Sequence, residues 1–142
     1  MSLQIITPLP AVLSEIGRVL VPGGRLVALV PDQGPLVGAD RLWLAGLLVA
    51  LGRSIGYPND FALRHMLPDL LGAAGLRLTD DRRLRFTYRL GSAGDADLLL
   101  SSLYLPGLPN RRLRASRRWL HAAAAVRAGF PVPLRRIVAV HR

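Results

Sequence analysis

Cysteine and lysine are both missing from this 142-residue chain. Without cysteine, disulfides and thiolate-bound zinc sites are excluded, and the sequence carries no record of the redox compartment. Without lysine, all 19 basic residues are arginine, and against nine acidic residues they give a net charge of +10. A basic surface can hold nucleic acid, acidic lipid or an anionic substrate, but charge balance bears on association rather than on fold.

The sequence shows neither the pattern of a secretory signal nor an apolar run of membrane-spanning length. The N-terminus has no basic segment followed by an apolar run, so no secretory signal is predicted. The longest unbroken apolar run, Leu42 to Leu51, is about half of the roughly 20 residues that a spanning helix needs. A soluble, cytoplasmic protein without a membrane span is therefore expected. Hydrophobic residues at 51% and a mean hydropathy of +0.31 are high for one small domain, which favours an apolar surface that contacts a partner.

The hydrophobic pattern predicts helices that alternate with strands. Helix limits are expected at proline, glycine and side-chain caps, and Pro68 is expected to kink or split the helix that contains it. The predicted elements are the end of a strand over residues 1–6, a helix from the N-cap Thr7 and Pro8 to Pro22, a strand over Leu26–Val30, a helix over Gly38–Arg53, a helix over Phe61–Ala74, a strand within Leu76–Leu90 after a turn at Asp80 and Asp81, a short helix or loop over Leu98–Leu105, a helix over Arg111–Ala128 and a strand over Leu134–Val140.

Two predicted helices have unusual faces. The helix over Gly38–Arg53 leaves almost no polar face, and helices that are apolar all round are buried or bound, so something is expected to cover it. The helix over Arg111–Ala128 is two-sided. Its basic side is expected to hold Arg111, Arg114, Arg118 and His121, and its apolar side Leu113, Leu120, Ala123 and Ala124.

Two segments carry a more specific pattern. Residues 3–10 read L-Q-I-I-T-P-L-P, and residues 15–26 read E-I-G-R-V-L-V-P-G-G-R-L. Farther along, residues 67–78 read L-P-D-L-L-G-A-A-G-L-R-L. Together they resemble the middle and C-terminal part of the class I S-adenosylmethionine-dependent methyltransferases. In that family the Pro-Gly-Gly block lies halfway along the domain, after the half that grips the cofactor.

The resemblance implies the fold class. We expect an α/β chain that forms the C-terminal portion of a Rossmann-like methyltransferase fold. It would have a three- or four-stranded mixed sheet, flanking helices and an additional helical insertion. The strands are expected near residues 4, 27, 85 and 138, with the last strand antiparallel beside the Pro-Gly-Gly strand. Residues 1–142 would then form a single partial domain, consisting of residues 1–30 (strand end, helix and Pro-Gly-Gly strand), 31–60 (apolar helical insertion), 61–90 (helix and strand), 91–130 (helical segment) and 131–142 (terminal strand).

The resemblance also implies a cofactor, S-adenosylmethionine, and a small, apolar acceptor. Ser2, Leu3 and Gln4 match the end of the family's fourth strand, which contacts the cofactor, although the simpler interpretation is that Ser2 and Gln4 only close a strand end. Trp43 and Tyr57 fall where the family lines its acceptor pocket, although the simpler interpretation is a core or interface helix in which Trp43 is a packing residue. Methyl transfer is an in-line displacement that needs no universal catalytic side chain, so no catalytic residue is assigned.

The cofactor-binding half is missing from the pattern, because the sequence contains no Gly-x-Gly turn of the kind that cradles a nucleotide at a helix N-terminus. The chain alone is therefore expected to be inactive. One sheet edge should lie open where the absent strands would pair. We expect a homo-oligomer or a complementing chain at that edge.

A second hypothesis is a non-catalytic interaction module that binds a partner chain or an acidic polymer through apolar helices and an arginine-rich face. Nucleic acid is not expected, because only Trp119 accompanies the arginines, and strand-binding surfaces need several aromatic side chains. His65 and Asp69 stand four residues apart, but a solvated surface pair is the simpler interpretation. His121 and His141 sit beside arginines in the sequence, so no metal site is predicted.

Overall fold

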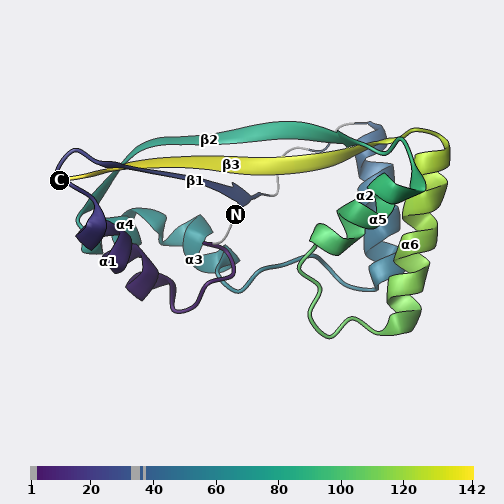
Figure 1. Cartoon of the computed structure of the whole chain (residues 1–142), viewed down its shortest axis with the longest axis horizontal. Coiled ribbons are helices and arrows are strands. Elements are labelled where there is room, and N and C mark those ends of the chain that lie inside the picture. The colour runs from purple at the N-terminus through teal and green to yellow at the C-terminus, as the bar shows by residue number, and fades with distance from the viewer. Residues whose placement is uncertain (1–2, 33–35, 37) are drawn as a thin grey trace. The chain divides into compact units, whose positions relative to one another are not determined.

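The structure is a computed structural model that describes residues 3–32, 36 and 38–142. Within this part, runs of helices separate the strands along the chain, so the predicted α/β class is confirmed (Figure 1). The elements are α1 (Leu9–Val19), β1 (Arg25–Pro31), α2 (Ala39–Leu51), α3 (Asp60–His65), α4 (Leu67–Ala73), β2 (Leu76–Arg89), α5 (Ala93–Ser102), α6 (Asn110–Ala125) and β3 (Gly129–His141).

The strands form one three-stranded sheet in the order β1-β3-β2. The terminal strand β3 pairs antiparallel with β1, in a register that runs from Arg25 opposite Val140 to Pro31 opposite Leu134. The predicted antiparallel placement of the last strand beside the Pro-Gly-Gly strand is thus confirmed. The predicted mixed character is wrong, because the sheet is antiparallel and β1 has no parallel neighbour among the described strands. β1 is consequently an edge strand.

The strand predicted near residue 4 is absent, because Leu3, Gln4 and Ile5 lie in a turn. Three backbone carbonyl groups in and beside this turn accept hydrogen bonds from one distant residue instead of from a neighbouring strand. Asn59 donates from Nδ2 to the carbonyl oxygens of Leu3 at 2.6 Å and Ile6 at 2.7 Å, and its backbone N–H donates to Gln4 at 3.1 Å. This amide side chain is buried and holds the turn in place.

The first helix begins one residue later than predicted. Pro8, not Thr7, occupies the N-cap position, and no side chain caps the helix. The first four backbone N–H groups of an α-helix have no intrahelical acceptor, so Pro10, which lacks an N–H, is tolerated at the second helical position. At the other end, Gly23 adopts a φ of 77°, which a residue with a Cβ rarely adopts. Its N–H donates to the His141 carbonyl at 3.1 Å, and this bond ties the turn to β3.

Pro68 splits the predicted helix over Phe61–Ala74 into α3 and α4, as expected. By contrast, the turn predicted at Asp80 and Asp81 is wrong, because β2 runs through both residues without a break. Their carboxylates accept hydrogen bonds from Arg136 and Arg135 of the neighbouring strand β3. These cross-strand pairs replace the local side-chain bonds with which aspartate usually favours a turn.

The chain divides into two compact units. Unit 1 contains residues 1–34, 57–84 and 133–142, and its core is formed by side chains from α1, α3, α4 and the sheet, including Leu13, Leu63, Leu67, Leu71 and Ile137. In this unit α1 approaches α4 so closely that a Cβ on Gly17 would lie 2.1 Å from the Ala74 carbonyl oxygen. Glycine is therefore required there.

Unit 2 contains residues 35–56 and 85–132. Its helices α2, α5 and α6 enclose a separate apolar core that includes Leu47, Leu51, Leu99, Leu120 and Phe130. The predicted cover of α2 is only partial, because Leu42 and Val49 are 61% and 74% exposed. The buried side of α6 is also narrower than the apolar side that was predicted, because Leu113 is 41% exposed. No helix in the described part of the chain is long and apolar enough to cross a membrane.

Candidate functional site

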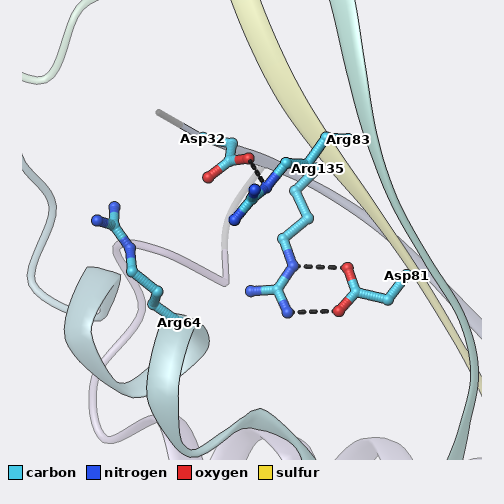
Figure 2. A pocket seen from close by; sticks show the side chains of 5 residues that line it. All are labelled: Asp32, Arg64, Asp81, Arg83 and Arg135. Atoms are coloured by element: carbon cyan, nitrogen blue, oxygen red, sulfur yellow. Dashed lines mark hydrogen bonds and ion pairs between the residues drawn. The ribbon is translucent and has the colours of Figure 1, made fainter. Parts of the chain in front are cut away.

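A charged hollow of about 400 Å³ opens on the surface of unit 1 (Figure 2). Its volume falls in the range that accommodates small molecules. The side chains around it come from the end of β1, from α3, from β2 and from β3. They are Asp32, Arg64, Asp81, Arg83 and Arg135.

Asp32 is the first residue after β1, and the sheet fixes its position. Its backbone N–H donates to the Pro133 carbonyl at 3.1 Å, which extends the β1–β3 ladder by one bond. The Asp32 side chain is only 9% exposed, and its Oδ2 atom lies 2.9 Å from Arg83 Nε. The geometry of this ion pair does not make a hydrogen bond, so Oδ2 is a buried acceptor without a hydrogen bond from the described residues. Such an atom is costly to bury.

Arg83 lies on β2, two residues after Asp81, and therefore on the same face of the strand. Its side chain is 70% exposed, so its attraction to Asp32 is largely screened by water. The terminal nitrogens of Arg83 make no hydrogen bond with any residue that the structure describes. A guanidinium in this state offers a fork of donors that fits a carboxylate or phosphate.

Asp81 and Arg135 form the rigid wall of the hollow. Arg135 donates to the Asp81 carboxylate from Nε at 2.7 Å and from Nη2 at 2.5 Å, and from Nη1 to the Leu63 carbonyl at 2.7 Å. The hydrogen bond from Arg135 holds the pKa of Asp81 below its usual value, and the same bond raises the pKa of Arg135. Both groups are therefore charged and engaged with each other (Figure 2).

The five lining side chains carry three positive and two negative charges. The Asp81–Arg135 pair is fully hydrogen-bonded, whereas the exposed Arg83 touches Asp32 through its Nε atom alone. The excess of one positive charge makes the hollow better suited to an anion than to a cation. Nothing in residues 3–32, 36 and 38–142 brings three His, Asp or Glu side chains together as a metal site.

The predicted cofactor residues lie elsewhere. Ser2 is outside the described residues. Leu3 and Gln4 are buried in unit 1, in the turn that Asn59 holds. Neither of them lines the hollow.

The predicted acceptor residues fall in different units. Trp43 lies on α2 in unit 2, where its ring packs against Trp119 with centroids 5.7 Å apart and its carbonyl accepts a bond from Trp119 Nε1 at 3.1 Å. Tyr57 belongs to unit 1, where its backbone N–H donates to Asp60 at 2.9 Å. Burial, and then the charge of Asp60, raise the pKa of Tyr57. Neither residue lines the hollow.

The histidines show no catalytic arrangement in the described part. His65 ends α3 and stacks on Phe61 at 4.9 Å, whereas Asp69 belongs to α4. His121 has an acidic neighbour that sequence did not indicate, because its Nε2 lies 2.8 Å from Asp97. Hydrogen bonds from Arg117 and then from His121 lower the pKa of Asp97 to about 2. This cluster joins α5 to α6 inside unit 2.

Sequence reasoning missed all five lining residues, although some signals were present. Asp32 follows directly on a buried strand, and Asp81 and Arg83 alternate on one face of the next one. The pairing of β2 with β3 could not be predicted from the sequence, and this pairing brings Arg135 to Asp81.

Comparison of the chain with protein-family models and with curated proteins finds no match. The functional proposal therefore depends on the residues of this chain and their contacts.

Proposed function

We propose that this chain forms the acceptor side of a class I S-adenosylmethionine-dependent methyltransferase, which transfers a methyl group to a small molecule. The observation that carries the proposal is the sheet. The strand that follows the Val-Leu-Val-Pro-Gly-Gly turn, β1, is paired antiparallel with the last strand, β3. The family resembled by residues 3–30 has the same relation between its Pro-Gly-Gly strand and its terminal strand.

The position of the hollow supports the same proposal. In the family, residues between the Pro-Gly-Gly strand and the next helix line the acceptor pocket. Asp32 is the first residue of that stretch and lines the hollow. Because methyl transfer depends mainly on holding donor and acceptor in line, a hollow with the doubly hydrogen-bonded Asp81–Arg135 pair as one wall is suited to the acceptor role. Trp43 and Tyr57 stay predictions for an apolar part of the acceptor, and the charged hollow favours a polar group beside it.

The cofactor would be held mainly by residues other than these. The 14 glycines of the sequence form no Gly-x-Gly turn, and donor nucleosides are held by such turns in Rossmann-like folds. The free edge of β1 offers backbone donors and acceptors to which further strands can pair. We therefore expect activity only when a segment with the cofactor cradle is present.

Calorimetric titration with S-adenosylmethionine tests the proposal. The titration compares this chain with the longer polypeptide encoded when its reading frame is extended upstream. We expect binding and methyl transfer by the longer polypeptide and no binding by the chain alone. Micromolar binding by the chain alone would contradict the division of roles, and a longer polypeptide that binds no S-adenosylmethionine would contradict the family assignment.

A second candidate function is binding of an acidic polymer by unit 2. Arg111, Arg114 and Arg118 are exposed along α6, and none of them has an ion-pair partner among the described residues. Binding to polyglutamate that weakens steeply with salt, and that is lost when these three arginines are changed to glutamine, would support this function. Binding that survives the triple substitution would exclude this face.

A further inference from the structure

We propose that the hollow in unit 1 binds a small molecule through an anionic oxygen group, a carboxylate or a phosphate, and that Arg83 donates the hydrogen bonds. For the identity of the methyl acceptor this inference rests on the proposed function, and it makes the acceptor an acid. For binding it depends only on the side chains of the hollow. Three guanidinium groups surround the opening, those of Arg64, Arg83 and Arg135 (Figure 2), and they differ in how far acidic groups engage them.

Arg83 has donors that no residue uses in the described part of the chain. Its Nε atom lies 2.9 Å from Asp32 Oδ2, but its terminal nitrogens Nη1 and Nη2 make no hydrogen bond there, and most of the side chain is exposed. The end of a guanidinium group presents two parallel N–H groups, which match two oxygens of a carboxylate or phosphate. An oxyanion bound at this end of Arg83 leaves the contact between Nε and Asp32 intact. The ligand therefore needs no access to the Asp32 oxygen.

The Asp81–Arg135 pair neither competes with this anion nor repels it. Arg135 donates to both oxygens of the Asp81 carboxylate and to the Leu63 carbonyl, at 2.5 to 2.7 Å. The positive charge of Arg135 thus neutralises the one aspartate of the hollow that is partly exposed beside it. Since its guanidinium group is engaged on both sides, Arg135 is not the group that binds the ligand, and the open donors are those of Arg83.

The exposed charge of the hollow is positive. The Asp32 carboxylate is only 9% exposed, whereas the Arg83 side chain is 70% exposed. Arg64, on the other side of the opening, is exposed as well (Figure 2). The lining as a whole has an excess of one positive charge. A cation that enters the hollow therefore meets guanidinium groups first, and an anion is favoured.

Four ring compounds of different charge test the inference by calorimetric titration of the intact chain at about pH 8. Phenyl phosphate carries about two negative charges at this pH, benzoate carries one, benzyl alcohol is neutral and benzylammonium is a cation. We expect one saturable site for both anions, with phenyl phosphate bound several-fold more tightly because the attraction grows with charge, and no saturable binding of the other two. Tighter binding of benzoate would assign the site to a carboxylate and would still support the inference. Equal affinity for benzyl alcohol and the anions, or no binding of either anion, would overturn it.

Substitutions on one strand distinguish a site at Arg83 from a general attraction of anions to arginine. Arg83→Gln should weaken binding of both anions at least about tenfold, the effect of losing hydrogen bonds to a charged group. Arg83→Lys keeps the charge but loses the paired donors, and should weaken binding several-fold. The matched control, Arg77→Gln, removes an exposed arginine of β2 outside the hollow and should leave both affinities unchanged. Equal losses in Arg83→Gln and Arg77→Gln would show that the anions respond only to net charge, which refutes the site.

These titrations contain no S-adenosylmethionine, so the two proposals can fail independently. Selective anion binding by a chain whose longer form never binds S-adenosylmethionine would keep the site and remove the methyltransferase. A longer polypeptide that methylates neutral acceptors as readily as acids would keep the methyltransferase and remove the acidic acceptor. Circular dichroism of each variant checks that it is folded, and the exposure of Arg83 makes its substitution a mild one.

Discussion

The two compact units use their charge in different ways. Unit 1 holds nine of the arginines and six of the acidic residues, whereas unit 2 holds ten arginines and only three acidic residues. In unit 1 the two aspartates at the middle of β2 pair with arginines across the sheet. In unit 2 the arginines of α6 outnumber their possible partners. Charged side chains in unit 1 thus pair with one another around the hollow, whereas many arginines of unit 2 lie on its surface without an acidic partner among the described residues.

Different interactions stabilise each of the two units internally. Unit 1 combines an apolar core with cross-strand ion pairs, and the charged hollow lies among those pairs. Unit 2 depends on an apolar core between three helices and on the Trp43–Trp119 contact. Loss of packing should therefore be most damaging in unit 2, and loss of charge should matter mainly in unit 1.

The largest effect is expected from a cavity in the core of unit 2. Leu120 on α6 is fully buried, so Leu120→Ala should lower the free energy of unfolding by about 2–5 kcal/mol. Leu113→Ala on the same helix removes a partly exposed side chain and should cost less than about 1 kcal/mol. Chemical denaturation followed by circular dichroism measures both. Equal costs would show that α6 is packed on a different face.

A smaller effect is expected where two helices touch in unit 1. Gly17→Ala places a methyl group against the Ala74 carbonyl oxygen and should destabilise the protein by about 1–3 kcal/mol, because the backbone must move. Gly72→Ala on α4 is the control, since nothing lies within 4 Å of its added Cβ. Amide hydrogen exchange should show faster opening in unit 1 of the Gly17 variant. Equal acceleration in unit 2 would show that the units open together.

The two aspartates of the hollow should respond differently to neutralisation. Asp81→Asn breaks a two-bond ion pair with Arg135 and should lower the free energy of unfolding by up to about 1 kcal/mol. Asp32→Asn removes a buried charge whose Oδ2 atom has no hydrogen bond from the described residues and whose ion pair with Arg83 is screened by water, so it should leave stability unchanged or raise it by a similar amount. Thermal unfolding compares the two variants. A lower midpoint in Asp32→Asn would mean that Asp32 serves the fold and not a ligand.

The smallest effect is expected from acid on unit 2. Because the pKa of Asp97 is lowered to about 2 in the folded chain, its ionised form contributes stability that is complete above its ordinary pKa of about 4. This contribution should be lost as the pH falls from about 4 to about 2. Chemical shifts of α5 and α6 amides should follow this titration. In Asp97→Asn the same shifts should stay constant across the range.

The elements with strong local signals could be predicted from the sequence. Helical spacing of apolar residues predicted α1, a long apolar run predicted α2, and Pro68 predicted the break between α3 and α4. The features set by distant residues could not be predicted. The turn at residues 3–5 depends on the side chain of Asn59, and the unbroken course of β2 depends on arginines of β3.

The candidate site was hidden for the same reason. Its members are scattered from Asp32 to Arg135, and each one looks like an ordinary surface charge when it is read alone. Only the strand order and the β1–β3 register bring them together. The resemblance directed attention to the segment after β1 but did not single out Asp32.

The contact between Trp43 and Trp119 has a practical consequence. The chain has two tryptophans, and both belong to unit 2, where the indole of Trp119 lies so close to Gly46 that an added Cβ would meet it at 2.0 Å. Fluorescence excited at the red edge of indole absorption therefore reports on unit 2 and carries no signal from unit 1. Energy transfer and quenching between the two indole rings would change if α2 and α6 moved apart, so their packing can be followed without an attached dye.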